Sequence, residues 1–486
     1  MDINLKVFQD VLTDLPRCLQ VSARTLFDML DPKLDPQIGA VAIPFNRNEL
    51  ISLKSTAGFN SQADWFGEIR SFLEEIPEWS LKDLAPDVQG VLWEQKVKIV
   101  DATRKIVDEK SSDTEHRAFP TLPEFMHGHC VFLILQISND ALESHYRLTK
   151  NAARPYPSQT SLIYETIVHF LSESLTPLKI LSEGRAAPIH FRDHGNNAMR
   201  EAGYWLMYTV GRATGNGASD DLFRAFNVIS SLQYEGDEGI GRIVICRQNH
   251  PNVDTVVRLR NRIALSNYRA IRKMLEMASN DICLLCDVKG IFGLGRVNAA
   301  AYNRKSESLF VVEFSHGQQW ELEHADSILM LVKYGVPGLP AKPINEDKFR
   351  LELMSKYPQL DTTMADCLWD LVVEASKQKS GTTLVISDHA NDEAERLKNQ
   401  STLIDPTLLT KELILPLSSI DGALLMDPEA TCYSVGVILD GMATKKGDPG
   451  RGARYNSAIR YLEYATKEKH SCLIVVISED GAINLF

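Results

Sequence analysis

The sequence has no apolar run long enough to cross a membrane and no excess of positive charge. Its apolar segment CVFLILQI, residues 130–137, has the length of a β-strand, whereas a membrane helix needs roughly 20 residues. The N-terminal segment MDINLKVFQD contains acidic residues and no signal-peptide core. A net charge of −12 argues against a clustered basic face for DNA. We therefore expect a cytoplasmic protein that binds neither membranes nor DNA.

The cysteines do not predict a disulfide framework. Eight of them are dispersed along 486 residues, which fits a reducing compartment. Cys283 and Cys286 form a CxxC motif, which invites a metal or redox interpretation. The surrounding DICLLCDV is typical of a strand, where residues three apart point to opposite faces and cannot bind one ion. We predict that both are buried structural thiols.

Two histidine-containing segments have side chains that can act as ligands. MHGHC places His127 and His129 on one face of a strand-like segment, but no third metal ligand is identifiable, so a structural role is favoured. HGQQWELEH, residues 316–324, is predicted to be an edge strand with exposed polar side chains rather than a ligand contact. No Walker A motif occurs, so phosphate binding must come from another loop.

A proline- and glycine-rich segment divides the chain. GVPGLPAKPINED, residues 335–347, has three prolines and two glycines and is predicted to be a linker. Before it, residues 1–334 mix helical and strand patterns, with a further break expected between 125 and 250. After it, residues 348–486 alternate helix and strand. We expect an α/β protein in which a larger α+β region precedes a C-terminal mixed β-sheet flanked by helices. A degenerate repeat of residues 252–334 in the C-terminal block remains an open alternative.

The most constrained chemistry lies between residues 418 and 481. The glycine-rich turn GDPGRGARYNSA opens onto a helix with one apolar stripe. Small residues such as Gly452 allow a ligand close to the backbone, and Arg454, Asn456 and Ser457 place donors where the helix begins. A helix N-terminus presents free N–H groups and partial positive charge, which favours phosphate. Arg454 adds a permanently charged guanidinium.

Carboxylates occur at both ends of this block. Asp421 precedes one predicted strand, and Glu479 follows another, directly after Ser478. If neighbouring strands bring them together, they can hold Mg²⁺ or Mn²⁺ and help to deprotonate a hydroxyl nucleophile. This combination indicates nucleotidyl transfer.

These motifs, taken in order, resemble the diadenylate cyclase (DAC) domain of bacterial DNA-integrity scanning proteins and membrane cyclases. The resemblance rests on Asp421-Gly422-Ala423, on the turn that leads into the helix, and on Ser478-Glu479, and it covers about the last quarter of the chain. Upstream, GTTLVI at 381–386 resembles the family's first strand. The family usually has Gly-Thr-Arg-His-Arg at the turn, where this chain has GARYN at 452–456, so the His and the second Arg are lost.

The resemblance implies a mechanism. Each DAC domain binds one ATP, and two domains meet face to face in a homo-oligomer, so that each 3′-hydroxyl attacks the other α-phosphate and cyclic di-AMP and two pyrophosphates form. By carry-over, Asp421 and Arg454 are the catalytic residues. The remaining roles are metal binding by Asp421 and Glu479, and nucleotide binding by Gly422, Ala423, Gly452, Arg454, Asn456, Ser457 and Ser478.

The resemblance also frames the rest of the chain. Residues 1–334 resemble sensor regions that precede divergent DAC domains, with an unknown ligand, and the family's separate DNA-binding region is expected to be absent. Three alternatives stay open. The domain is a catalytically silent nucleotide-binding module, it makes a different cyclic dinucleotide, or the protein is an interaction scaffold, against which the retained Asp421 and Arg454 argue.

Overall fold

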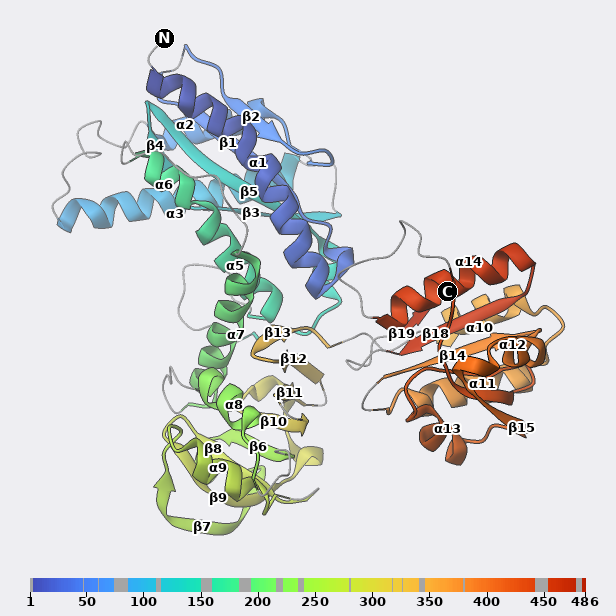
Figure 1. The fold of residues 1–486 in the computed structure, drawn as a ribbon. Helices are drawn as coiled ribbons and strands as arrows, with labels where there is room; N and C mark the ends of the chain where they lie inside the picture. Colours follow the sequence, from blue (N-terminus) through green and yellow to red (C-terminus); the bar gives the residue numbers. More distant parts are fainter. Residues whose placement is uncertain are drawn as a thin grey trace. The chain divides into compact units, whose positions relative to one another are not determined.

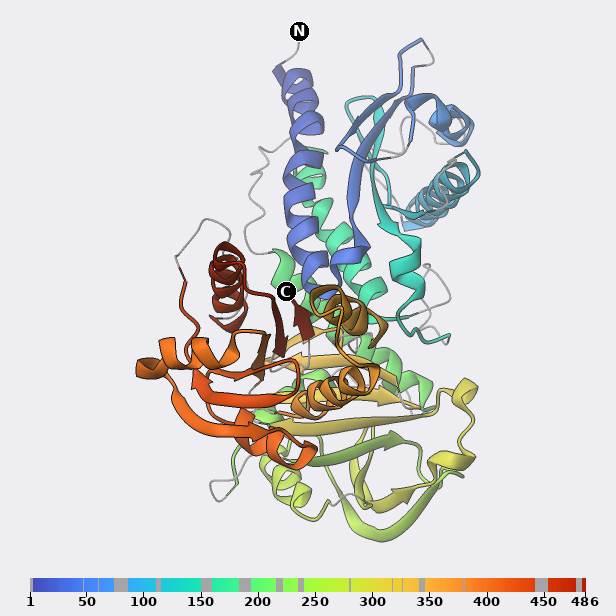
Figure 2. The ribbon, with the colours of Figure 1, turned by 90° about the vertical axis from the view of Figure 1, so that its right-hand side faces the viewer.

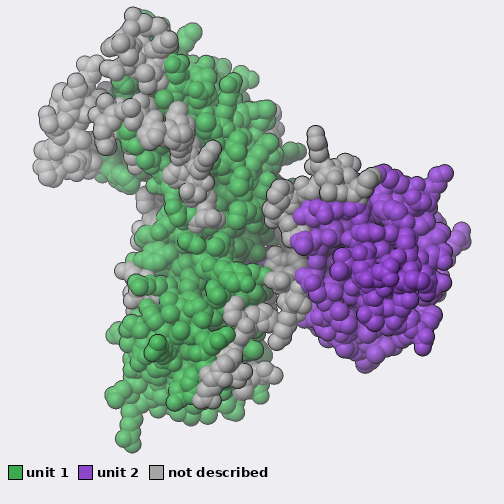
Figure 3. Space-filling model, viewed as in Figure 1, with its two compact units in different colours: residues 1–339 green, residues 340–486 purple. Residues whose placement is uncertain are grey.

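Two compact units make up the chain, residues 1–339 and residues 340–486 (Figure 3). The computed structural model describes residues 3–46, 48–59, 61–73, 86–110, 115–149, 160–182, 194–215, 222–234, 240–278, 281–316, 318–325, 327–340, 346–378, 381–441, 453–477 and 483–486. The division between the units falls inside the segment expected to be a linker, residues 335–347. Part of that segment is nevertheless a strand, β13 (Val336–Gly338).

The first unit begins with a five-stranded antiparallel sheet in the order β2-β1-β5-β3, with β4 also paired to β5. Its strands are β1 (Gln37–Pro44), β2 (Ser52–Ser55), β3 (His116–Pro120), β4 (Glu124–Met126) and β5 (His129–Ser138). Every residue of β1 is buried, because both faces of the sheet are covered. The covering elements here are α1 (Ile3–Leu30), η1 (Pro32–Leu34), η2 (Ala63–Ile69), α2 (Arg70–Leu73) and α3 (Pro86–Lys110).

Helices connect this sheet to a second one (Figure 1). They are α4 (Asn139–Glu143), α5 (Leu162–Ser174), α6 (Thr176–Ser182), α7 (His194–Ala213) and α8 (Leu222–Ser231). α7 packs against α1 and α5 and also against α8 and β13. The largest apolar core of the first unit therefore runs from Phe8 to Val332, beside two smaller clusters. No helix in the described ranges is both long and apolar enough to span a membrane.

The second sheet of this unit has eight strands in the order β13-β12-β11-β10-β6-β8-β9-β7. Besides β13, they are β6 (Gly241–Cys246), β7 (Val253–Ile263), β8 (Cys283–Asp287), β9 (Gly290–Val297), β10 (Leu309–His316), β11 (Gln319–His324) and β12 (Ser327–Lys333). α9 (Tyr268–Leu275) joins β7 to β8, and η4 (Ala299–Ala301) and η5 (Arg304–Ser306) lie between β9 and β10. Cys283 and Cys286 are buried in different apolar clusters, as the strand interpretation requires.

Two local predictions were wrong. β11 is not an edge strand, because it pairs with both β10 and β12 and buries Trp320, Leu322 and His324. His127 and His129 do not share a strand. His127 has a positive φ of 47° in the turn before β5, and His129 is the first residue of β5. Both rings lie about 5 Å from the ring of Phe8, which is a packing role.

The second unit is a six-stranded mixed sheet between two helical layers (Figure 1, Figure 2). In chain order its elements are α10 (Glu346–Lys356), α11 (Thr362–Ala375), β14 (Thr382–Ser387), α12 (Ala390–Arg396), η6 (Lys398–Gln400), β15 (Thr402–Leu408), α13 (Lys411–Ser418), β16 (Ala423–Met426), β17 (Thr431–Val437), α14 (Ala453–Glu468), β18 (Cys472–Ile477) and β19 (Ile483–Leu485). α10, α11 and α13 pack on one face, and α12 and α14 on the other. The predicted fold class, a C-terminal mixed sheet flanked by helices after a larger α+β region, is confirmed.

The two units contain the same arrangement of six strands. The order β15-β17-β16-β14-β18-β19 repeats β7-β9-β8-β6-β10-β11 strand for strand along the chain. In both, the central strand has one parallel neighbour, and the other pairs are antiparallel. α8 and α9 correspond in chain position to α11 and α13. The internal repeat that the sequence left open is therefore visible as a shared topology, and between β9 and β10 only η4 and η5 stand where α14 stands between β17 and β18.

Three carboxylates gather on one face of the second sheet. Glu313, Glu321 and Glu323 offer oxygens within 4.8 Å of one another, and Arg242 lies 3.2 Å from Glu313 and 3.4 Å from Glu323. Burial, reinforced by Glu323 and Glu313, raises the pKa of Glu321 to about 7. Arg242 is the one cation paired with this group of three carboxyl groups, and Glu321 is therefore protonated below neutral pH.

The raised pKa of Glu321 predicts a pH-dependent stability. The pKa of its carboxyl is higher in the folded state than the ordinary value of 4.5. The stability that the protonated carboxyl contributes to the folded state is therefore lost as the pH rises from about 4.5 to about 7. Glu321→Gln keeps the neutral form, so its melting temperature should exceed that of the wild type at pH 8 and approach it at pH 5. Scanning calorimetry of the full-length protein measures this. Asp254→Asn, at an exposed carboxylate of the same sheet, is the control, and an equal shift at both pH values would contradict the assignment.

Candidate functional site

Chain segments distant in sequence meet at one edge of the second unit's sheet. β16 runs parallel to β14, with Ala423 opposite Thr383, so Asp421 precedes β16 at the edge where β14 begins. β17 and β18 run the other way, and both end there, with Val437 opposite Ala423 and Ile477 opposite Thr382. This strand direction is the reason that Asp421 lies at the same end of the sheet as the last residues of β17 and β18.

An ion pair joins two of the predicted site residues at this edge. Arg454 Nη2 lies 2.8 Å from Asp421 Oδ1, although the two residues are 33 positions apart. The Asp421 side chain is 93% exposed and that of Arg454 is 29% exposed. The backbone N–H of Gly422 donates to the same carboxylate oxygen at 3.1 Å. Because so exposed a pair contributes little to stability, both charges are available to exchange partners with a ligand.

The first turn of α14 supplies the remaining donors. Arg454, Asn456 and Ser457 all lie within five residues of the start of this 16-residue helix. The backbone N–H groups of a first helical turn have no partner within the helix, and they carry partial positive charge. With the Arg454 guanidinium, this turn is suited to an anionic group such as phosphate.

A buried network fixes α14 on the sheet. Ala458, Tyr461 and Ala465 form its buried stripe. The Tyr461 hydroxyl donates to Glu393 of α12 at 2.9 Å, and burial raises the pKa of Tyr461, so that it remains a donor. Glu393 is 3% exposed. A buried carboxylate is costly unless it is hydrogen-bonded, so this contact restrains α14 relative to α12.

Arg396 extends this network to the segment after β17. Its guanidinium donates to Glu393 and makes two hydrogen bonds of 2.8 Å to Asp440. Glu393 and Arg396 are three residues apart on a helix, which the sequence shows, but nothing local indicates Asp440 as their partner. The chain after β17 is thus anchored on α12 at Asp440.

Gly422 and Ala423 have packing roles of their own. Gly422 has a φ of +117°, and a Cβ at this position would lie 2.5 Å from the carbonyl carbon of Gly436. Ala423 is 2% exposed, and its backbone lies in register between Thr383 and Val437. Close approach of either backbone to a nucleotide stays a prediction.

Three predicted site residues, Gly452, Ser478 and Glu479, lie outside the described residues. β18 ends at Ile477, two strands from β16, and two strand spacings amount to about 10 Å. Asp421 provides an exposed carboxylate of the kind that Mg²⁺ and Mn²⁺ prefer, and metal binding by Asp421 together with Glu479 stays a prediction. Cys472 of β18 is no nucleophile, because burial raises the pKa of its thiol to about 12.

Comparison with known proteins identifies three segments. Residues 14–207 match the probable sensor domain DACNG, and residues 220–326 match the probable sensor domain DACNH. Residues 371–486 match the DAC model, described as DisA bacterial checkpoint controller nucleotide-binding. No curated protein matches the chain.

Among solved structures, the chain is similar to a hypothetical membrane spanning protein from Bacillus cereus. The two are 23% identical over 27% of this chain, with a TM-score of 0.22. The match covers 63% of that protein, which is less than two thirds of its length.

The contact of Gly422 with Gly436 yields a structural prediction. Gly422→Ala should lower the free energy of unfolding by at least about 2 kcal/mol, because the added Cβ meets backbone at a positive φ. Hydrogen-exchange mass spectrometry of β16 and β17 in the full-length protein, with urea, measures this. Gly67→Ala is the control, since nothing lies within 4 Å of its Cβ position. Unchanged protection with lost nucleotide binding would instead assign Gly422 to the ligand.

Proposed function

The chain combines a C-terminal DAC domain with two probable sensor domains, and we propose that it is a diadenylate cyclase regulated by its N-terminal region. In this proposal two ATP molecules are converted into cyclic di-AMP and two pyrophosphates. The observation that carries it is the Asp421–Arg454 pair, at the edge where the α14 N-terminus meets the sheet. It joins the acidic and phosphate-binding motifs of the family in one place.

Different residues act on the triphosphate and on the 3′-hydroxyl. The first turn of α14 and Arg454 hold the triphosphate and neutralise the charge that grows on the departing pyrophosphate. Asp421 lies beside them, where an incoming 3′-hydroxyl can give up its proton. A bound Mg²⁺ or Mn²⁺ would lower the pKa of that hydroxyl and shield the phosphates.

Bond changes require two copies of the domain. In each half-reaction a bond forms between the 3′-oxygen of one ATP and the α-phosphorus of the other, and the bond from that phosphorus to pyrophosphate breaks. Since both nucleotides react as nucleophile and as electrophile, two sites must face each other in a homo-oligomer. The exposed position of Asp421 and the partial exposure of the first turn of α14 support this arrangement. The protein contributes positioning and charge neutralisation.

One observation favours the alternative of a catalytically silent nucleotide-binding module. The family's His at the turn is replaced by Tyr455, whose ring packs 5.0 Å from that of Phe486. The family's second Arg is replaced by Asn456. This helix start therefore has less positive charge for a triphosphate than the family pattern. A different cyclic dinucleotide remains the second alternative, because the groups that contact the base are unassigned.

Product analysis tests the proposal. Full-length protein with ATP and Mn²⁺ should yield cyclic di-AMP by mass spectrometry, and Asp421→Asn should reduce the rate at least about 100-fold. The control Glu395→Gln neutralises another exposed carboxylate of the same unit, 3.4 Å from Lys398, and should retain the rate. If the wild type binds ATP but forms no product, the silent module is supported. If the wild type neither binds ATP nor forms product, the cyclase and the silent module are both contradicted.

Restoring the family's second cation gives an independent prediction. Asn456→Arg should tighten ATP binding about 10- to 100-fold, since a charge-assisted hydrogen bond contributes about 1.5–3 kcal/mol. Thr466→Arg is the matched control. It adds the same charge to an exposed position of α14, about 15 Å farther along the helix, and should leave the dissociation constant unchanged. Calorimetric titration measures the affinity for ATP. If both variants and the wild type bind ATP equally well, position 456 does not contact the triphosphate.

A further inference from the structure

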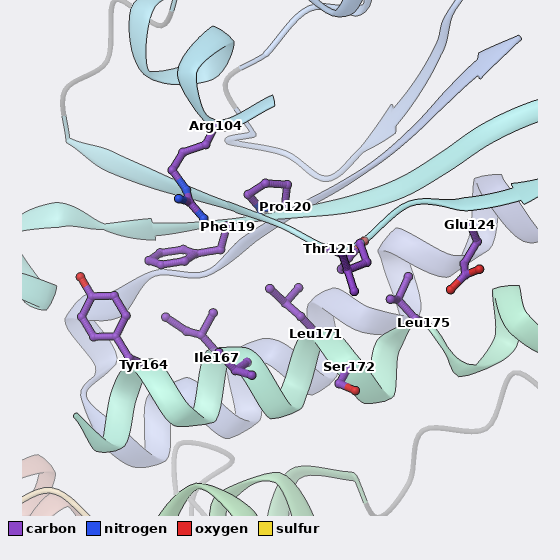
Figure 4. A pocket seen from close by; sticks show the side chains of 12 residues that line it. Arg104, Phe119, Pro120, Thr121, Glu124, Tyr164, Ile167, Leu171, Ser172 and Leu175 are labelled. Carbon is purple, nitrogen blue, oxygen red and sulfur yellow. The ribbon is translucent and has the colours of Figure 1, made fainter. Parts of the chain in front are cut away.

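A pocket of about 180 Å³ lies in the first unit, in the segment that matches the DACNG sensor model. Figure 4 shows it between α5 on one side and β3 with the chain that follows it on the other. Its walls are mainly apolar, and they include Phe119, Ile167, Leu171 and Leu175, all less than 10% exposed. An apolar cavity of about 150 Å³ holds a benzene molecule, so this pocket has room for an apolar body of about six to eight carbons.

Charge is unevenly placed around the pocket. Figure 4 places Arg104, Phe119 and Tyr164 toward one end and Glu124 toward the other. Glu124 is neutralised by Lys96 at 3.2 Å. In contrast, within the described ranges the Arg104 guanidinium has only a long ion pair of 3.8 Å, to an Asp101 that is 65% exposed. The charge of Arg104 also acts on Asp108 of the same helix, so these two acidic partners of Arg104 are both solvent-exposed, and a ligand carboxylate can compete with them.

The Arg104 end also offers a hydroxyl donor. Arg117 Nη1 donates to the Tyr164 oxygen at 2.7 Å, so that oxygen is an acceptor and its proton remains to be donated. A carboxylate accepts hydrogen bonds from both a guanidinium and a phenol. An ammonium group has no lone pair to accept them and would be repelled by Arg104.

We propose that this pocket binds a medium-chain carboxylate, with the alkyl chain between α5 and β3 and the carboxylate on Arg104 and Tyr164. The chain length follows from the volume and the walls, and the head group follows from the charge of Arg104, whose acidic partners Asp101 and Asp108 are solvent-exposed. The free carboxylate is the occupant, rather than an esterified acyl chain, because an ester has no negative charge to bind to Arg104. The proposal concerns binding and does not depend on cyclase activity.

Calorimetric titration of the full-length protein with octanoate tests the proposal. We expect saturable binding of one octanoate with a dissociation constant below about 1 mM. Acetate lacks the apolar body, octylammonium reverses the charge, and methyl octanoate removes it, so each should bind at least about tenfold more weakly. No octanoate binding at 5-fold higher concentration, about 5 mM, or equal binding of methyl octanoate or octylammonium, would overturn the proposal.

Variants locate the site. Arg104→Gln should weaken octanoate binding at least about tenfold, whereas Lys105→Gln, which removes a 73% exposed charge from the same helix, should not. Leu171→Phe fills the pocket and should abolish binding by a separate route. Circular dichroism confirms that each variant is folded. Equal octanoate affinity in Arg104→Gln and Lys105→Gln, or retained affinity in Leu171→Phe, would place the ligand elsewhere.

Discussion

The candidate site depends on the position of α14 on its sheet. Strand direction alone brings Asp421 and the ends of β17 and β18 to one end of the sheet, but the cationic partner of Asp421 comes from α14, which follows β17 in the chain. The Tyr461–Glu393 hydrogen bond and the apolar stripe of α14 hold that helix in place. Removing one partner from a buried carboxylate is more costly than the bond itself contributes, so the network resists displacement of α14.

The repeated topology of the two units shows what the sheet supplies and what the helix adds. Both sheets bring strand ends together in the same way, and in both the equivalent strand is preceded by an aspartate, Asp281 before β8 and Asp421 before β16. In the second unit, α14 lies between β17 and β18 in the chain. In the first unit, η4 and η5 lie between the equivalent strands, β9 and β10. The sheet of the first unit instead carries Glu313, Glu321 and Glu323 with a single Arg242. Such a face repels triphosphate, so shared topology does not imply a shared ligand.

Sequence periodicity predicted what is local. Motif order assigned Asp421 and Arg454 to one nucleotide site, but it did not predict the ion pair between them. The alternation of a strand was enough to place Cys283 and Cys286 on opposite faces. The same alternation led to the wrong prediction that β11 is an edge strand. β11 is an interior strand, and its Glu323 pairs across β10 with Arg242 of β6. The turn at His127 was missed because a positive φ interrupts the period.

Contacts between distant segments were beyond prediction. The Arg396–Asp440 bonds join residues 44 positions apart, and the apolar pocket exists only because α5 packs near β3. Neither leaves a periodic or compositional signal in one sequence. The DAC motifs were recognisable because their residues keep a fixed order along the chain, whereas the sensor region presents a core whose pattern is common to many folds.

The size of the pocket also limits how strongly its occupant can act on the rest of the unit. α5 lines the pocket and packs on α7, which contacts α8 and β13, next to the division between the units. A ligand shifts a conformational equilibrium only by its difference in affinity for the two states, and a change from 1:99 to 99:1 requires about 5.5 kcal/mol. Burying the six methylenes and the methyl group of octanoate contributes at most about 6 kcal/mol before the entropic cost of binding. A ligand of this size would therefore grade the output of a sensor of this kind rather than switch it completely.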